Sequence, residues 1–482
     1  MINKNIIGKV LSFLLMGEAV FMLLTLLVSL IYKENDITAF AYSFAITFGI
    51  GFLTFLLTRK GPVTISKREG YIIVTFGWII FSFFGSLPFI LSNAIPSFTD
   101  SFFETMSGFT TTGSSILNNI EELPHGILFW RSLIQWLGGM GFIVLSLAIL
   151  PILGIGGMQL FVAEVPGPTP DKLHPRIKET AQKLWGIYIL FTALETVLLY
   201  FGGMSVFDAI CHSFTTMATG GYSTKQDSIG HWNSPYIQWV IIIFMFIAGT
   251  NFTLSYFGLH GKIRKVWENE EFRFYFFFTA GFSLIITLSL IFFHDLPWFT
   301  AVTDAVFQVV SVITTTGFAT ADYELWTPFL STLILILMFF GGSAGSTGGG
   351  VKIVRIVLLI KNGYFELKRL IHPQAVIPVR FNKRAVDQGI VHNVIAFIIF
   401  YVFIFAVGVV IMTFLEPNLD TAIGAVATTL GNIGPGIGSV GPTENFAHFS
   451  DVSKWFLSFL MLLGRLELFT VLLLFTRAFW KK

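Results

Sequence analysis

Charged residues are scarce in this chain of 482 residues. Asp, Glu, Lys and Arg make up 12% of the sequence, about half of the roughly 25% that is usual in soluble domains. The hydrophobic share is 54% and the mean hydropathy is +0.75. These values exclude an ordinary soluble protein and indicate an integral membrane protein. The net charge of +2 gives no sign of nucleic-acid binding.

Cysteine and the short motifs of common enzymes are also lacking. The single Cys211 excludes an intramolecular disulfide and a Cys-rich metal site. The nine histidines show no HExxH zinc spacing. Gly436 to Gly441 spells a dinucleotide fingerprint, but it sits in a predicted loop and not between a strand and a helix. We therefore expect no enzymatic activity and no bound cofactor.

Long apolar segments recur along the whole chain. A bilayer core requires roughly 20 apolar residues for each spanning helix. Ten such spans are predicted, near residues 11–31, 38–57, 71–91, 127–153, 183–203, 236–258, 272–293, 328–360, 389–414 and 455–476. The first lacks a small-residue cleavage site and is followed at once by the second, so it is interpreted as an anchor and not as a signal peptide.

The loops between the spans alternate in charge. Lys and Arg cluster in 59–70, 171–183, 262–273, 352–384 and the C-terminal tail. The alternate loops, 92–126, 204–234, 297–327 and 416–452, are acidic, and only Lys225 offsets their negative charge. The positive-inside rule then places the basic loops and both termini in the cytoplasm.

The four acidic outer loops share a repeat in which an aspartate precedes a glycine. The pairs are separated by 13, 12, 13 and 14 residues: Asp100 and Gly113, Asp208 and Gly220, Asp304 and Gly317, and Asp420 and Gly434. Each aspartate is expected to cap a helix of about 10 to 12 residues, which is too short to cross a bilayer. Asp and Gly are common in polar turns, but four matched loops on one face favour re-entrant pore loops.

The predicted fold is an all-α polytopic membrane protein. Four helix, pore-loop, helix repeats are expected in a pseudo-fourfold arrangement around one pore, together with two extra N-terminal transmembrane helices. The predicted units are 1–69 for the two extra helices and 70–170, 171–264, 265–370 and 371–482 for pore repeats 1 to 4.

The residues before and at each glycine can bind a dehydrated monovalent cation. Backbone carbonyls supply several oxygens without a buried negative charge, as they do in potassium filters. Glycine permits φ > 0, so consecutive carbonyls can face one axis. The predicted ion-binding residues are Thr111, Thr112, Gly113, Thr219, Gly220, Thr315, Thr316, Gly317, Asn432, Ile433 and Gly434.

Five strings in these loops resemble the Trk, Ktr and HKT superfamily of cation transporters. They are FTTTGSSIL, TTMATGGYST, TTTGFATADY, GNIGPGIGSVGP and GGSAGSTGGGVK. Nearly the whole chain is covered, and the two extra N-terminal spans favour the bacterial Trk type. In this superfamily a serine at the first filter glycine goes with sodium preference, so Gly113 implies potassium. No loop carries the TVGYG string of tetrameric channels, so weaker rejection of sodium is expected.

The resemblance also implies partners and a location. It implies a homodimer, in the bacterial inner membrane, that takes up K⁺ and passes Rb⁺. It further implies a cytosolic nucleotide-binding ring protein of the Trk type, docked on the basic inner loops as a regulator.

The span near 328–360 contains six glycines in the ten residues from Gly341 to Gly350. Each glycine costs a helix interior about 1 kcal/mol relative to alanine, so a continuous helix is not expected. By resemblance this loop is the gate beneath the filter, with Gly345, Ser346 and Thr347 across the pathway and Lys352 beside it. The alternative is a kink that lets helices pack closely.

Arg465 lies within the last span, where a buried charge costs about 2.5 to 3.5 kcal/mol on insertion scales. By resemblance it projects into the pore below the filter and limits the passage of cations. The alternative is a packing ion pair, with Glu195 as the candidate partner.

Two other functions are alternatives to a channel-like pore, namely a coupled symporter and a membrane enzyme. A symporter that couples potassium to protons or sodium would use carboxylates on the pathway, and few acidic residues lie within the spans. A membrane enzyme acting at the outer face would need a cluster of catalytic side chains, and none is recognisable around His212.

Overall fold

The computed structural model describes residues 2–59, 65–139, 177–375 and 377–481. In this described part, regular structure is almost entirely helical. The exception is a small antiparallel hairpin in which β1 (Arg380–Phe381) pairs with β2 (Arg384–Ala385).

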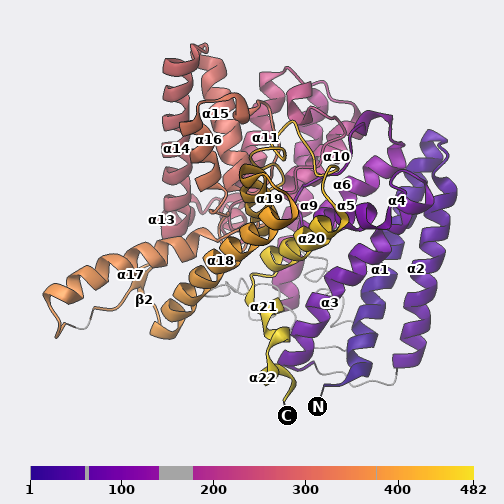
Figure 1. Ribbon diagram of the computed structural model, residues 1–482, viewed down its shortest axis with the longest axis horizontal. Helices are drawn as coiled ribbons and strands as arrows, with labels where there is room; N and C mark the ends of the chain where they lie inside the picture. Colours follow the sequence, from indigo (N-terminus) through magenta and orange to yellow (C-terminus); the bar gives the residue numbers. More distant parts are fainter. Residues whose placement is uncertain (1, 60–64, 140–176, 376, 482) are drawn as a thin grey trace.

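The described part contains six helical segments long and apolar enough to cross a membrane. They are α1 (Lys4–Tyr32), α2 (Ile37–Thr58), α3 (Lys67–Gly85) continued by α4 (Leu87–Leu91), α9 (Ile177–Phe201), α14 (Glu270–His294) and α18 (Gln388–Leu415). α1 and α2 form an antiparallel pair at one edge of the molecule (Figure 1). Large apolar side chains remain exposed on these helices, for example Leu57 at 76% and Phe414 at 90%, as is expected of a surface that faces lipid.

Four short helices follow the first helix of each predicted repeat. They are α5 (Phe98–Phe109), α10 (Val206–Met217), α15 (Trp298–Ile313) and α19 (Leu419–Gly431). The expectation that aspartates cap them is wrong. The caps are Ser97, Ser205, Pro297 and Asn418. Ser97, Ser205 and Asn418 accept the backbone N–H of the aspartate itself, whose carboxylate therefore lies in the first turn near the positive end of the helix dipole.

The helix that follows each short helix is interrupted. α11 (Pro235–Ala248) and α12 (Phe252–Leu259) meet at 112°, and α20 (Asp451–Arg465) meets the segment 469–475, which contains α21 (Phe469–Leu472), at 111°. The predicted spans near 236–258 and 455–476 are therefore present as bent pairs of helices and not as single straight helices. Asn251 caps α12 by accepting the Thr253 N–H at 2.7 Å, and Leu468 at φ 57° ends the helical path in the last repeat.

The predicted break in the third repeat is present and longer than expected. α16 (Pro328–Leu337) ends well before Gly341, and α17 (Ile353–Ile371) begins after Lys352. In Figure 1, α17 projects away from the helical bundle. α6 (His125–Gly139) is followed by residues outside the described part, so the predicted span 127–153 is described only as far as Gly139. The remaining short helices are α13 (Ile263–Glu268) and α22 (Arg477–Trp480).

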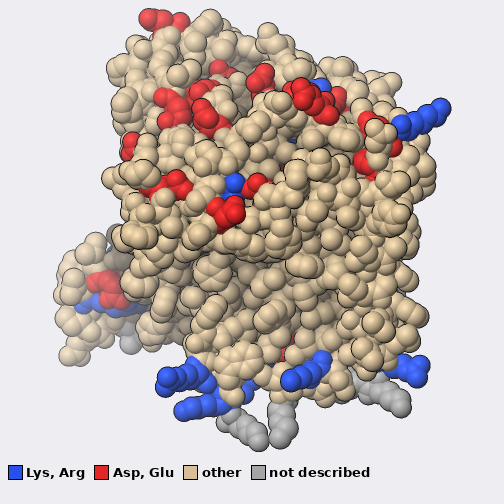
Figure 2. All heavy atoms as spheres, turned by 45° about the vertical axis from the view of Figure 1, so that its right-hand side comes forward, with Lys and Arg blue, Asp and Glu red and all other residues tan. Residues whose placement is uncertain are grey.

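Both termini lie at the same end of the molecule (Figure 1). The start of α3 holds them there: Glu69 accepts the Asn3 N–H at 2.8 Å, and Arg68 donates to the Lys481 carbonyl at 2.7 Å. Figure 2 shows Lys and Arg gathered along the lower edge of the visible face, whereas most Asp and Glu lie in its upper part. The charge asymmetry inferred from the loops is therefore visible on this face of the molecule.

Candidate functional site

Each short helix ends in the same turn. A left-handed residue ends each one, with φ of 54° at Thr111, 53° at Thr219, 58° at Thr315 and 54° at Asn432; it follows the C-cap in the first three helices and is the C-cap in the fourth. The next N–H reaches back to the third-last helical carbonyl, for example from Thr112 to Ser107 at 2.8 Å. This is the Schellman arrangement, which normally uses glycine. A β-branched residue costs roughly 1 to 2 kcal/mol there, and such strain clusters at functional sites.

Two residues after each left-handed residue stands a glycine with positive φ. These glycines are Gly113 (85°), Gly221 (75°), Gly317 (83°) and Gly434 (103°). In the second segment the equivalent residue is thus Gly221, and the predicted Gly220 corresponds instead to Thr112, Thr316 and Ile433. With Gly221 the distance from the aspartate becomes 13 residues, as in the first and third loops. We call 110–114, 218–222, 314–318 and 431–435 the four turn segments.

The turn segments contact one another in a closed ring. A Cβ on Gly113 would lie 2.3 Å from the carbonyl oxygen of Gly220, in the second segment. The same test gives 2.0 Å from Gly221 to Thr316 O, 1.9 Å from Gly317 to Ile433 O, and 3.0 Å from Gly434 to Thr112 O. Each glycine therefore abuts the carbonyl before the next segment's glycine, and the fourth segment returns to the first. Only a residue without a side chain fits this approach.

The four glycines also line a single pocket. Its volume is about 80 Å³, enough for several water molecules or a partly hydrated ion. Arg131 on α6 lies in its wall, and most of the rest comes from residues that follow the glycines in the loops, including Ser114, Ser115, Tyr222 and Ser223. These residues belong to the acidic loops, so the pocket opens on the acidic side of the turn segments.

Amide side chains hold the turn segments from behind. Gln135 on α6 donates to the Gly220 carbonyl at 2.7 Å and accepts the Tyr222 N–H at 3.0 Å. Asn432 donates to the Thr112 hydroxyl at 2.9 Å and to the Met461 carbonyl at 3.0 Å. Gln135 therefore fixes the shape of the second segment against α6, and Asn432 joins the fourth segment to the first.

The glycine-rich loop, residues 341–350, lies on the opposite side of the turn segments from the pocket. The Gly349 N–H donates to the Thr315 hydroxyl at 2.7 Å, and Thr347 donates to the carbonyls of Met217 at 3.1 Å and Ala248 at 3.2 Å. A Cβ on Gly349 would lie 2.7 Å from the Asn432 side chain. The predicted Ser346 stands in this loop with a buried hydroxyl, and Gly345 is at φ 76°.

Arg465 joins the loop to the first turn segment. Its guanidinium donates to the Thr111 hydroxyl at 3.1 Å and to the Thr347 carbonyl at 2.9 Å. It also donates to the carbonyls of Gly138 at 2.5 Å and Gly139 at 3.0 Å. These contacts place a positive charge next to the left-handed residue of the first segment and the middle of the glycine-rich loop.

Of the residues that fasten the two ends of this loop, Lys352 was predicted from the sequence, whereas Glu271 and Arg355 were missed. Glu271, at the start of α14 and 5% exposed, accepts the N–H groups of Ala344 at 2.7 Å and Val354 at 3.2 Å. Lys352 donates to the Gly348 carbonyl. Arg355 forms an ion pair with Glu467, which has φ 51° at the break after α20. The partners of Glu271 and Arg355 are distant in sequence, and the only local signal was a charge near an apolar span.

Comparison with known proteins supports a single family. The TrkH family of cation transport proteins matches residues 36–482. The chain is 45% identical over 466 residues to the Trk system potassium uptake protein TrkH of Salmonella typhimurium, covering 96% of each protein. It is 45% identical over 462 residues to the protein of that name from Escherichia coli K12, covering 95% of each.

A solved structure agrees over the full length. The crystal structure of the potassium transporter TrkH from Vibrio parahaemolyticus superposes with a TM-score of 0.89 at 39% identity and covers 99% of both chains. Its likeness thus extends over the turn segments, the glycine-rich loop and the interrupted helices. The chain belongs to the TrkH family of cation transport proteins, a family of transporters and not of enzymes.

Proposed function

We propose that the chain takes up K⁺ through a channel-like pore that passes between the four turn segments. The observation that carries this proposal is the closed ring, in which four glycines line one pocket and each abuts the carbonyl of the next segment. Such a ring brings backbone oxygens from all four segments to one place. Relatives that share nearly half of the residues are potassium uptake proteins by name, and the chain is a multi-pass membrane protein.

The ion-binding oxygens would come from the predicted residues together with Gly221. These residues are Thr111, Thr112, Gly113, Thr219, Gly220, Gly221, Thr315, Thr316, Gly317, Asn432, Ile433 and Gly434. Positive φ at the left-handed residue and again at the glycine lets successive carbonyls turn to the same side. The negative C-terminal ends of the four short helices add a field that favours a cation below the ring.

We propose that the glycine-rich loop and Arg465 form the gate. The loop contacts the turn segments on the side away from the pocket, where an ion leaving the ring would have to pass. Gly345, Ser346 and Thr347 would obstruct that path, and the Arg465 charge would raise the barrier for a cation. Lys352, within the same hydrogen-bonded unit, would hold the end of the loop.

Glu271→Ala should loosen this gate. The substitution leaves the N–H groups of Ala344 and Val354 without their acceptor, and each buried unsatisfied donor costs about 1 to 3 kcal/mol. We expect a lower midpoint of thermal unfolding in detergent and faster Rb⁺ leakage through the resting protein. Glu271→Gln is the matched control, because its amide oxygen can still accept both N–H groups. If the Glu271→Ala protein leaks Rb⁺ no faster than the Glu271→Gln protein, the two hydrogen bonds accepted by Glu271 do not restrain the gate.

We propose that the basic end of the molecule, with both termini, faces the cytoplasm of a bacterial inner membrane. The acidic loops around the pocket would then gather cations at the outer mouth. An inside-negative potential supplies about 2.3 kcal/mol per charge for each 100 mV, which can drive uptake without a chemical step. A homodimer and a cytosolic nucleotide-binding ring protein on the basic end remain part of the proposal by family resemblance.

A measurement of reversal potential tests this function. The purified chain in a planar bilayer should carry a current that reverses at the K⁺ Nernst potential. The reversal should not move when a pH gradient is imposed, because no proton is coupled to the K⁺ current. A reversal that shifts with the pH gradient would instead support the coupled symporter. A chain that passes neither K⁺ nor Rb⁺ would refute both.

A further inference from the structure

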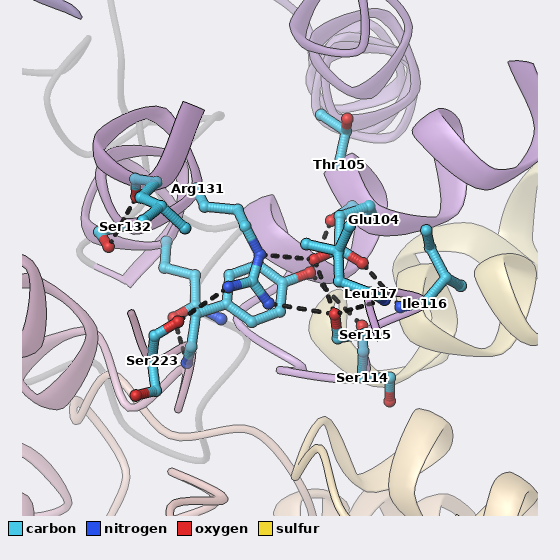
Figure 3. Close-up of polar contacts among 12 residues, drawn as sticks. Glu104, Thr105, Ser114, Ser115, Ile116, Leu117, Arg131, Ser132 and Ser223 are labelled. Atoms are coloured by element: carbon cyan, nitrogen blue, oxygen red, sulfur yellow. Dashed lines mark hydrogen bonds and ion pairs between the residues drawn. The ribbon is translucent and has the colours of Figure 1, made fainter. Parts of the chain in front are cut away.

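A buried ion pair lies behind the ring, between the first and second turn segments. Glu104 on α5 is 0% exposed and Arg131 on α6 is 2% exposed. Figure 3 shows their side chains pointing toward one another, and the Arg131 Nε donates to Glu104 Oε1 at 2.7 Å. It is the most buried ion pair in the described part of the chain.

The pair holds the backbone that follows Gly113. Glu104 accepts the Ile116 N–H at 3.0 Å and the Ser115 hydroxyl at 3.1 Å. Arg131 donates to the same hydroxyl from its other side at 3.1 Å (Figure 3). Because both charged side chains form hydrogen bonds with this short segment, residues 114–116 have little freedom to shift.

The same arginine holds the backbone that follows Gly221. Arg131 donates to the Ser223 carbonyl at 2.9 Å, and its guanidinium carbon lies 3.9 Å from the centre of the Tyr222 ring. Tyr222 also contacts the other member of the ion pair, since its hydroxyl donates to the Glu104 backbone carbonyl at 2.7 Å. One guanidinium thus contacts the residues that directly follow two adjacent turn segments. Glu104 neutralises it, so its charge does not repel a cation in the pocket that Arg131 helps to line.

The contacts known at the other boundaries of the ring are of another kind. Between the third and fourth segments the Tyr323 hydroxyl donates to the Gly436 carbonyl at 2.7 Å, and between the fourth and first the Phe446 N–H donates to the Ser115 carbonyl at 2.8 Å. A buried ion pair contributes little net stability relative to apolar residues of similar volume. Its value lies in geometry, since the planar fork of arginine fixes several acceptors at once.

We infer that Glu104 and Arg131 are positioning residues that set how strongly the pore prefers K⁺ over Na⁺. This inference rests on the proposed pore. Rejection of Na⁺ requires that the oxygens not follow the smaller ion inward, and the pair restrains the two segments it joins. Weaker restraint would let Na⁺ be coordinated without changing any oxygen that contacts the ion.

The test measures the K⁺ to Na⁺ permeability ratio in planar bilayers. Arg131→Lys keeps the charge but loses the fork and the stacking on Tyr222, and we expect the ratio to fall by about tenfold. Tyr222→Phe removes one hydroxyl, which donates to the Glu104 carbonyl at 2.7 Å and lies 3.4 Å from the Ser114 carbonyl, and we expect a fall of about two- to threefold. Should Arg131→Lys fail to assemble, the double variant Glu104→Leu with Arg131→Met leaves no unpaired charge and should show at least the same loss.

Lys361→Gln is the matched control, because it breaks the ion pair with Glu270, away from the ring, and should leave the ratio unchanged. A purely stabilising role for the buried pair predicts lower thermal midpoints with an unchanged ratio, and that result would overturn the inference. Wild-type protein in the same bilayers distinguishes a failure of the proposed pore from a failure of the positioning role. If the wild type passes no K⁺, the proposed pore fails, whereas a selective wild type with equally selective variants defeats only the positioning role.

Discussion

Gly113→Ser should lower the K⁺ to Na⁺ permeability ratio by at least about tenfold. The new Cβ would lie 2.3 Å from the Gly220 carbonyl oxygen, which must retreat by about 1 Å to reach an ordinary van der Waals separation. That oxygen belongs to the proposed ion-binding set, so its displacement changes the cavity that replaces the hydration shell. The ratio is read from reversal potentials under K⁺ and Na⁺ gradients.

Gly203→Ser is a control that separates the effect of the clash with the Gly220 carbonyl from the effect of backbone strain. Gly203 has φ 102°, also outside the range that serine favours, but no atom lies within 4 Å of its Cβ position. We expect some loss of stability and no change in selectivity. If the two variants have the same permeability ratio, the ring of carbonyls does not determine which ion passes.

Arg465→Gln should raise the K⁺ flux by about tenfold or more. A unit charge about 8 Å from the path of a cation contributes a barrier of about 2 kcal/mol at an effective dielectric constant of about 20, and about 1.4 kcal/mol changes a rate tenfold. The substitution also weakens the bonds from the arginine to Thr111 and Thr347, which tie the loop to the first turn segment. Initial rates of Rb⁺ uptake into proteoliposomes measure the change.

Two controls assign this effect to charge at the pore. Arg465→Lys retains the charge with fewer donors, so its flux should stay closer to wild type than that of Arg465→Gln. Arg264→Gln removes an arginine that is 90% exposed and pairs with Glu268, and it should change nothing. Equal fluxes for Arg465→Gln and wild type would contradict a barrier role for Arg465.

The turn segments were largely predictable from the sequence, and the one shift of register is instructive. The spacing of 12 residues from Asp208 to Gly220 is one shorter than in loops one and three, and the spacing of 14 in loop four is one longer. Choosing Gly221 gives 13 residues and restores the match with loops one and three. Two adjacent glycines made both alignments available, and the tertiary contacts decide between them because only Gly221 abuts Thr316.

The left-handed threonines could not have been predicted from local preference. Schellman turns favour glycine, and Thr111, Thr219 and Thr315 are β-branched. The conformation persists because neighbouring structure holds it. Arg465 binds the Thr111 hydroxyl, and Gly349 binds that of Thr315. Sequence patterns indicate only the local energetic cost of a conformation, whereas Thr111 and Thr315 are fixed by partners more than 30 positions away.

One interruption of a helix could be predicted from the sequence, and another could not. The glycine run at 341–350 predicted the break in the third repeat, because six glycines destabilise a helix wherever it lies. The break after α20 has no such signal, since Glu467 and Leu468 favour helix on their own. There the ion pair between Glu467 and Arg355, 112 residues apart, accompanies the change of direction.

Anomalous diffraction from crystals soaked in Rb⁺ tests the central claim most directly. If the four turn segments bind the ion through their backbone oxygens, an anomalous peak will lie on the axis of the ring, between Gly113, Gly221, Gly317 and Gly434. A protein that transports Rb⁺ yet shows its peak elsewhere, with none inside the ring, would contradict the account.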